Sequence, residues 1–402
     1  MTQTERLARA TAHLPAPVAV VDLDAFDANT ADLRRRARGV PVRVASKSVR
    51  VRSLVGRALD AGFQGVMAFS LAEALWLVQE GTSDVLVGYP TVDTDALARL
   101  ASDVRARREI TLMVDDVAQL ALLDAALRAA APVGSGASSG ALPDVAVCLD
   151  VDASLRLDVG PLQLHLGTRR SPLRTPGNVA ALARRVEALP GARLRGLMFY
   201  EAQVAGLPDT NPAVRMVKRL SVTDLDRRRA EVRDAVRAAV GHDVPLVNSG
   251  GTGSLETSSA GPAVTEVTAG SGLFVPGLFD GYRAFDPRPA AFFGLDVVRL
   301  PAPGWATAFG GGYVASGPAG RSRLPRVATP GWSLTGTEGA GEVMTPLRRR
   351  RGAPPLAVGD RVWLRHAKAG ELMERFDVVH LVRGDAIVET VPTYRGEGRT
   401  FG

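Results

Sequence analysis

The chain has 402 residues, of which 46% are hydrophobic and 23% are charged, and its mean hydropathy is +0.05. At roughly 100–200 residues per domain, this length indicates two domains or a barrel with an appended domain, and the composition excludes an intrinsically disordered chain. The formal net charge is +7, but only three of the 49 basic residues are lysine and the arginines are scattered among acids. No basic strip interleaved with aromatic residues is present, so the charge does not indicate a nucleic-acid partner.

The single cysteine, Cys148, lies within the apolar run 145–149. One cysteine cannot form an internal disulfide, and this surrounding favours a buried thiol in a reducing compartment. No apolar stretch approaches the roughly 20 residues that a membrane span needs, and residues 1–17 lack the pattern of a secretory signal. We therefore expect a cytoplasmic protein without a membrane partner.

A strand at 19–22 and a helix at 24–38 are the first predicted elements. Next, eight short apolar runs alternate with helical segments, the pattern of repeated βα units around a parallel sheet. The runs are 42–46, 65–69, 84–87, 110–114, 145–150, 194–199, 245–248 and 264–268. The helical segments include 53–61, 71–80, 93–101, 117–131, 176–188 and 213–240. Eight units favour a (β/α)₈ barrel, with an open doubly wound sheet as the alternative.

After about residue 272, glycine and proline become frequent and helical periodicity fades. Strands are predicted at 292–300, 362–364, 378–382 and 386–391, which indicates a smaller, mostly β domain. We expect the barrel to cover residues 1–275 and the β domain 276–402, and the strand at 19–22 can join the latter. Surface loops are predicted at 131–143 and 348–355.

Lys47 follows the first barrel strand directly, in the run Val44-Ala45-Ser46-Lys47. In such a barrel the chemistry stands on the loops after the carboxyl ends of the strands. A lysine there is partly desolvated, which disfavours the ammonium form and leaves the amine able to attack a carbonyl. Because the chain avoids lysine elsewhere, we predict a functional role for Lys47.

Glycine-rich turns follow the last two barrel strands. They read Asn248-Ser249-Gly250-Gly251-Thr252-Gly253-Ser254 and Ala269-Gly270-Ser271-Gly272. Such turns let backbone N–H groups converge on an anion, and barrels commonly place phosphate sites after strands seven and eight. The two turns together predict a phosphate site.

Aromatic and basic side chains stand at the same end of the predicted barrel. Tyr200 ends the sixth strand, and His165 and Arg169 lie in the segment after the fifth. These groups can hold a flat heteroaromatic ring. Asp115, Asp116, Asp150 and Asp152 also stand at this end; acids there are typical of turns and caps, and one can orient a ring-binding arginine.

An amine, a phosphate cradle and ring-binding side chains together predict a site for pyridoxal 5′-phosphate (PLP). At these residues the sequence resembles the alanine racemase-like, fold type III family and, within it, the D-threonine aldolase and D-serine dehydratase branch. The resemblance covers most of the chain, including the opening strand Ala19-Val20-Val21-Asp22, the lysine strand, and the closing β domain.

The resemblance implies a role for each matching residue. Lys47 would hold PLP as a Schiff base and later act as a base, while Arg169 and Tyr200 would lie near the ring. Phosphate would be held by Gly250, Gly251, Thr252, Gly253, Gly270 and Ser271, with Ser249 and His165 as further cofactor contacts. Homodimers are typical of the family.

One segment departs from that branch, whose members carry a His-X-Cys or His-X-Asp metal pair in the C-terminal domain. Here the segment reads Arg365-His366-Ala367-Lys368-Ala369-Gly370-Glu371. His366 matches a metal ligand, but the Lys368 ammonium is no ligand. Either Glu371 or another oxygen completes a divalent metal site, or no metal is bound. In the second case, which we favour, His366 and Lys368 act on the substrate themselves.

We therefore predict a PLP-dependent lyase of amino acid metabolism. It would act on small β-hydroxy amino acids by retro-aldol cleavage or by dehydration and deamination. An amino-acid racemase is the nearest alternative; its second base would be a tyrosine, with Tyr282, Tyr313 and Tyr394 as candidates. A PLP carrier without catalytic activity is a further alternative, which the appended domain disfavours.

Overall fold

The structure is a computed structural model that describes residues 1–131, 142–160, 162–209, 211–283, 286, 288–368 and 370–401. Most of the loop predicted at 131–143 lies outside the described residues. The chain divides into two compact units, and each of them is discontinuous in sequence. One consists of Leu33–Ser46, Ala58–Ala269 and Phe401–Gly402, and the other of Met1–Asp32, Lys47–Arg57 and Gly270–Thr400.

The first unit is built on a closed barrel of parallel strands, in the order β10-β11-β2-β3-β4-β5-β6-β9. The predicted (β/α)₈ barrel is therefore confirmed. Its strands are β2 (Val42–Ala45), β3 (Val66–Ala68), β4 (Val85–Val87), β5 (Ile110–Val114), β6 (Val145–Asp150), β9 (Ala192–Phe199), β10 (Leu246–Ser249) and β11 (Glu266–Ala269). Every residue of β5 and β6 is buried, as expected for strands covered on both faces.

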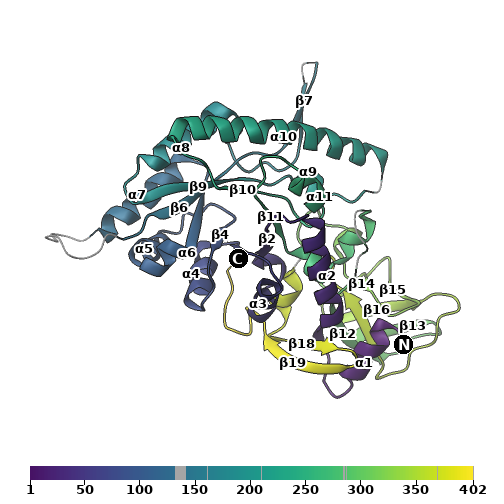
Figure 1. Cartoon of the computed structure of the whole chain (residues 1–402). Coiled ribbons are helices and arrows are strands. Elements are labelled where there is room, and N and C mark those ends of the chain that lie inside the picture. The colour runs from purple at the N-terminus through teal and green to yellow at the C-terminus, as the bar shows by residue number, and fades with distance from the viewer. Residues whose placement is uncertain are drawn as a thin grey trace. The chain divides into compact units, whose positions relative to one another are not determined.

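Amphipathic helices follow the barrel strands. They are α3 (Arg52–Asp60), α4 (Leu71–Gln79), α5 (Thr94–Ser102), α6 (Val104–Glu109), α7 (Val117–Ala130), α8 (Pro176–Glu187), α9 (Ala202–Ala205), α10 (Pro212–Val240), α11 (Leu255–Ser259) and α12 (Ser271–Phe274). The long helix α10 packs along α8 (Figure 1). Its ends follow from local chemistry: Asn211 accepts a hydrogen bond from the Val214 N–H, and Gly241 ends the helix in the left-handed conformation with φ of +81°.

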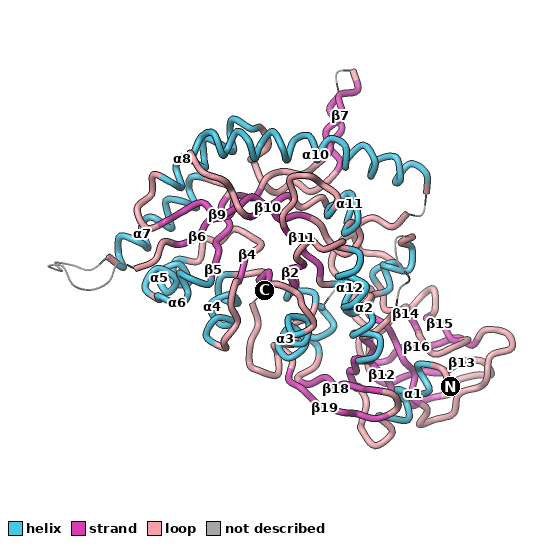
Figure 2. Tube along the Cα trace, in the orientation of Figure 1, coloured by secondary structure: helices cyan, strands magenta, loops and turns pink. Residues whose placement is uncertain are grey.

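A β-hairpin that the sequence did not predict interrupts the connection after β6, the fifth barrel strand. Its strands are β7 (Leu155–Val159) and β8 (Leu162–Leu166), which pair antiparallel. The hairpin projects past helix α10 (Figure 2). The segment after β6, in which His165 and Arg169 were predicted as site residues, therefore contains two strands.

The second unit contains a sheet of order β15-β16-β13-β12-β1-β18-β19, with β17 paired to both β12 and β14. Its strands are β1 (Val18–Asp22), β12 (Ala291–Arg299), β13 (Trp305–Phe309), β14 (Arg326–Val327), β15 (Trp332–Leu334), β16 (Met344–Arg349), β17 (Arg361–Arg365), β18 (Val378–Arg383) and β19 (Ala386–Pro392). The four strands predicted after residue 290 are present, whereas β13 to β16 were not predicted. The predicted loop 348–355 begins within β16.

The N-terminal strand β1 lies inside this second sheet, antiparallel to β12 and parallel to β18. Helix α1 (Gln3–Ala10) and helix α2 (Leu23–Arg36) flank it in sequence. Leu7 of α1 and Val20 of β1 share an apolar cluster with Phe292, Trp363 and Val382. Residues from both ends of the chain thus form one core. No described helix is both long and apolar enough to span a membrane.

Candidate active site

Three of the predicted site segments follow neighbouring barrel strands. Lys47 lies in a 3₁₀ turn, η1 (Ser46–Ser48), directly after β2. The turn 249–253 continues from β10, and Gly270 follows β11. Strands β10, β11 and β2 are consecutive around the barrel and run parallel, so their carboxyl ends lie at the same end of it. In addition, the hydroxyls of Ser48 and Ser271 lie 3.1 Å apart.

In the barrel unit, the buried carboxylate of Glu201 organises the turn after β10. Glu201 accepts hydrogen bonds from the hydroxyls of Ser249 (2.8 Å), Ser254 (3.0 Å) and Ser258, and from the Gly250 N–H (3.2 Å). The buried Arg229 guanidinium lies 3.3 Å from the same carboxylate and donates to the Ser249 hydroxyl at 2.6 Å. Several donors thus converge on one carboxylate and fix the path of the turn.

Glycine is required in this turn by its backbone and its neighbours. Gly250 has a φ of +88°, in the left-handed region that disfavours other residues. A Cβ on Gly251 would lie 2.9 Å from the Ala205 side chain and 3.6 Å from the Tyr200 ring. The predicted phosphate turn and the predicted ring residue Tyr200 are therefore close together.

The arginine that contacts Tyr200 is Arg170, the neighbour of the predicted Arg169. The Arg170 guanidinium carbon lies 5.4 Å from the centroid of the Tyr200 ring and 5.6 Å from that of Tyr89. Both distances allow cation–π attraction. The sequence showed two consecutive arginines, and only the path of the backbone decides which one reaches the tyrosines.

Two acidic residues stand at the carboxyl ends of the neighbouring strands β5 and β6. Burial and, to a smaller extent, the charge of Asp115 raise the pKa of Asp150 to about 7 against the opposing charge of Arg170. Burial also raises the pKa of Asp115, although Gln119 donates a hydrogen bond to it at 2.8 Å. Asp150 is therefore partly protonated near neutral pH, which the sequence did not reveal.

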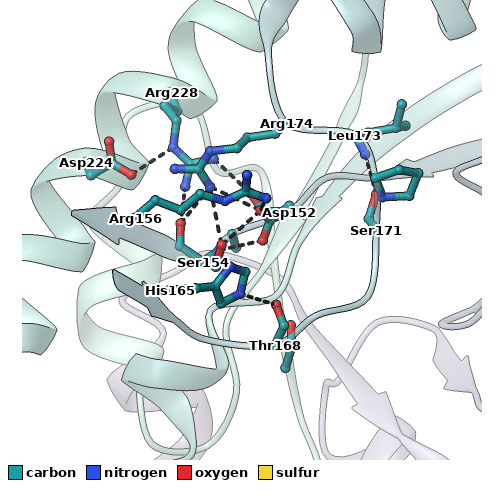
Figure 3. Close-up of polar contacts among 12 residues, drawn as sticks. Asp152, Ser154, Arg156, His165, Thr168, Ser171, Leu173, Arg174, Asp224 and Arg228 are labelled. Atoms are coloured by element: carbon teal, nitrogen blue, oxygen red, sulfur yellow. Dashed lines mark hydrogen bonds and ion pairs between the residues drawn. The ribbon is translucent and has the colours of Figure 1, made fainter. Parts of the chain in front are cut away.

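A second network holds the hairpin segment after β6 (Figure 3). The buried Asp152 carboxylate accepts bonds from Ser154 Oγ (2.9 Å), Arg156 Nη2 (2.8 Å) and Arg174 Nη1 (3.1 Å). Arg228 of α10 donates to the backbone carbonyls of Asp152 (2.7 Å) and Ser154 (3.0 Å). These bonds anchor the base of the hairpin to helix α10.

The predicted cofactor residue His165 belongs to this hairpin. Its Nε2 lies 3.0 Å from the carbonyl oxygen of Thr168 (Figure 3). This local bond closes the turn after β8. A cofactor role for His165 stays a prediction.

In the second unit, residues 370–375 pack against the backbone around Lys47. A Cβ on Gly370 would lie 2.7 Å from the Lys47 carbonyl oxygen, so only glycine allows this approach. Arg50 donates to the same carbonyl at 3.2 Å and to Glu374 at 2.7 Å. The 3₁₀ helix η4 (Gly370–Arg375) is thereby fastened to the residues that follow β2.

His366 and Lys368 differ sharply in their surroundings. His366 has no exposed surface, and its ring packs edge-on against Phe274 with centroids 6.1 Å apart. Burial and the charge of Arg365 together lower the pKa of His366 to about 3, against the opposing effect of the Ala291 backbone. The imidazole is therefore neutral. Lys368 is half-buried, and its Nζ donates to Ser316 Oγ at 2.7 Å.

Comparisons with known proteins agree with this architecture. The family model described as alanine racemase, N-terminal domain, matches residues 21–276. D-Threonine aldolase from Arthrobacter sp. is 26% identical over 299 residues, which cover 73% of this chain and 70% of the aldolase. D-threo-3-Hydroxyaspartate dehydratase from Delftia sp. (strain HT23) is 28% identical over 272 residues, covering 65% of this chain and 61% of the dehydratase.

Solved structures with this fold include two of the same kinds of enzyme. The crystal structure of D-threonine aldolase from Filomicrobium marinum has a TM-score of 0.79 at 22% identity and covers 96% of each chain. The Delftia dehydratase has a TM-score of 0.73 at 24% identity, covering 94% of this chain and 97% of its own. A variant of that dehydratase has also been solved in a metal-free form.

Proposed function

Because the chain belongs to the alanine racemase N-terminal domain family, we propose that it is a PLP-dependent lyase acting on small β-hydroxy amino acids. The observation that carries the proposal is that Lys47 comes directly after β2, which follows β10 and β11 around the barrel, the strands that lead into the glycine-rich turns. The matching relatives are named as an aldolase and a dehydratase, and both names support this reaction class.

The residues of this chain fit the cofactor. A phosphate needs several N–H and hydroxyl donors that converge without side chains in the way. The turn around Gly250 and Gly251 has no Cβ in the way, although its Gly250 N–H donates to Glu201 and its Gly251 N–H donates to Ser254 Oγ in this structure. Ser271 carries a further hydroxyl at the start of α12. Arg170 and Tyr200 supply a flat cationic and a flat aromatic surface for the ring.

When bound, PLP would supply an electron sink for the bond that breaks at the substrate's Cα. The Lys47 amine would bind the cofactor covalently and, once displaced by the substrate's amino group, would remain beside Cα as a base that accepts and returns a proton. Glu201 would keep the phosphate turn in shape without touching substrate. Arg170 would hold the cofactor ring, and the Asp150 carboxyl group would partly neutralise the charge of Arg170.

Racemisation is the second candidate, and the described tyrosines support it less well. Burial raises the pKa of Tyr313, with a further contribution from Glu371, so this phenol stays protonated. Tyr394 is 1% exposed, and Tyr282 packs against Phe279 with ring centroids 4.9 Å apart. A second base on Cα needs a tyrosine that can lose its proton, and the raised pKa of Tyr313 disfavours that role.

Borohydride reduction followed by peptide mass spectrometry tests the covalent step. We expect a pyridoxyl group on Lys47 in the wild-type protein and its loss in Lys47→Ala. Lys218→Ala is the matched control, because Lys218 pairs with Asp209 on the barrel unit and stands in neither predicted turn. A label on Lys218 or Lys368 would contradict the proposal.

Turnover separates the remaining alternatives. With both hands of threonine and 3-hydroxyaspartate, we expect release of an aldehyde with glycine, or of ammonia with a keto acid. Loss of optical rotation without either product would indicate the racemase, and tight PLP binding without any turnover would indicate the carrier. The homodimer and the cytoplasmic location stay predictions; sedimentation of the holoenzyme measures the first.

A further inference from the structure

The segment 366–371 does not offer the ligands that a divalent metal needs. Among the described residues, no group of three or more His, Cys, Asp or Glu side chains could hold a metal ion. His366 supplies one imidazole, and the residue two positions later is a lysine. The metal pair of the resembling branch needs a thiolate or carboxylate two positions after the histidine, and an ammonium has no lone pair to donate, so these residues do not fit a metal.

The charges near His366 also disfavour a second positive ion. Arg365 adjoins His366 and already pairs with Asp280 at 2.9 Å. Lys368 contributes a further positive charge within two residues. A divalent ion at His366 would therefore meet two cations, and burial of the ring leaves little water to screen that repulsion.

The Lys368 ammonium is instead held in a defined position. Its Nζ donates to Ser316 Oγ at 2.7 Å and approaches the Ser316 carbonyl oxygen at 3.3 Å. The Ser316 N–H in turn donates to the Glu371 carboxylate at 3.1 Å. Ser316 is thus hydrogen-bonded to both Lys368 and Glu371.

The same segment is anchored next to Lys47. Gly370 contacts the backbone carbonyl of Lys47 and the peptide of Ser48. Lys368 lies two positions before Gly370, and two residues of extended chain span at most about 7 Å. The ammonium therefore belongs to the neighbourhood of the lysine that the proposed function assigns to the cofactor.

We propose that the Lys368 ammonium binds the β-oxygen of the substrate, so that this enzyme works without a divalent metal. The inference rests on the proposed function. An ammonium shares with a metal ion a positive charge aimed at an oxygen lone pair, and it adds hydrogen-bond donors. Ser316 is then a positioning residue that aims the ammonium, and His366 fills the core behind it.

The test uses purified holoenzyme and begins with metal. We expect far less than one equivalent of any divalent metal by elemental analysis, and unchanged activity after prolonged EDTA treatment. Added Mn²⁺ should keep its free electron paramagnetic resonance signal in the presence of the protein. Stoichiometric metal, or EDTA inactivation that Mn²⁺ reverses, would overturn the inference while leaving the proposed lyase function intact.

Variants test the ammonium itself. Lys368→Gln should lower kcat/KM for a β-hydroxy amino acid about 100-fold, the typical effect of removing one transition-state donor, with PLP absorbance unchanged. Lys218→Gln, the matched control, should retain wild-type values. Ser316→Ala should give a smaller loss, and Lys368→Arg should recover part of the activity, because it keeps the charge.

The outcomes distinguish a failure of the Lys368 role from a failure of the proposed lyase function. Equal activities of Lys368→Gln and Lys218→Gln would overturn the role of Lys368 alone. Should Lys368→Gln fail to fold, Ser316→Ala and the metal measurements on the wild type still decide. A wild-type protein without cofactor on Lys47, or without lyase activity, would contradict the proposed function and the inference with it.

Discussion

Replacing Asp152 by asparagine should destabilise the barrel unit, because this carboxylate is the centre of the network in Figure 3. The side chain is 3% exposed and accepts four hydrogen bonds. Two come from Ser154, and the others come from Arg156 and Arg174. Asparagine keeps the shape but removes the charge and turns an NH₂ group towards these donors.

The size of the effect follows from the exposure of each partner. Arg156 is 35% exposed, so its ion pair contributes at most about 1 kcal/mol. Arg174 is 18% exposed and the two Ser154 donors are buried, so the remaining charge-assisted bonds contribute about 1.5–3 kcal/mol each before compensation. Removing the charge from a buried pair typically costs about 3–5 kcal/mol. We expect Asp152→Asn to lower the free energy of unfolding by about 3 kcal/mol.

Urea unfolding at pH 7 gives the global change, and hydrogen exchange of residues 151–175 gives the local one. Asp124→Asn is the matched control, because Asp124 forms an exposed helical pair with Arg128 at 2.7 Å. We expect the control to leave the unfolding midpoint unchanged. If Asp152→Asn behaved like Asp124→Asn in both measurements, the network would not hold the hairpin segment and the reasoning would fail.

The pH dependence gives a second check of the same variant. Burial raises the pKa of Asp152, but bonds from Ser154 and Arg156 and the charge of Arg174 lower it more, so the net pKa lies below its ordinary value of 3.8. The native state then holds the proton less tightly than the unfolded chain. The extra stability of the wild type should be full above about pH 4 and disappear as the pH falls below it.

Three further predictions concern the site. Glu201→Gln removes the carboxylate that fixes the turn after β10. We expect the PLP dissociation constant, followed by cofactor absorbance, to rise at least about tenfold. An unchanged constant would show that the turn keeps its conformation without the Glu201 carboxylate. Arg170→Gln should lower kcat/KM, while Arg169→Gln should stay near wild type; the reverse order would refute the assignment made from the tyrosine contacts. Burial and the charge of Asp115 raise the pKa of Asp150 to about 7. The native state therefore binds this proton more tightly than the unfolded chain, and the wild type should lose stability as the pH rises from about 4 to about 7. Asp150→Asn should not show this loss, as thermal melts at several pH values will show.

The barrel could be predicted because its strands are continuous apolar runs between periodic helices. The run Val145–Asp150 is buried at every position, and the pattern of α10 runs almost without interruption to Gly241. The hairpin β7–β8 was missed because its strands are short and lie in a segment that was interpreted as a site-bearing loop. Strands β13 to β16 were missed because two to six residues among glycines and prolines leave too short a pattern.

The contacts within the site could not be predicted, because they join residues far apart in the sequence. Glu201 stands next to the predicted Tyr200, but its partners Ser249, Ser254 and Ser258 are about 50 residues away in sequence. No local pattern connects them, although a carboxylate directly after a buried strand was a signal that could have been followed. Whether Arg169 or Arg170 reaches Tyr200 depends on the backbone of a connection whose hairpin was not predicted.

The placement of β1 has a consequence for how the protein is made. This strand is synthesised before β12 and β18, between which it lies and which follow it by about 270 and 360 residues. All eight barrel strands are translated before β1 can acquire either neighbour. During that interval Val18–Asp22 exposes two unpaired edges, so chaperone capture of the nascent chain should concentrate on the segment around this strand.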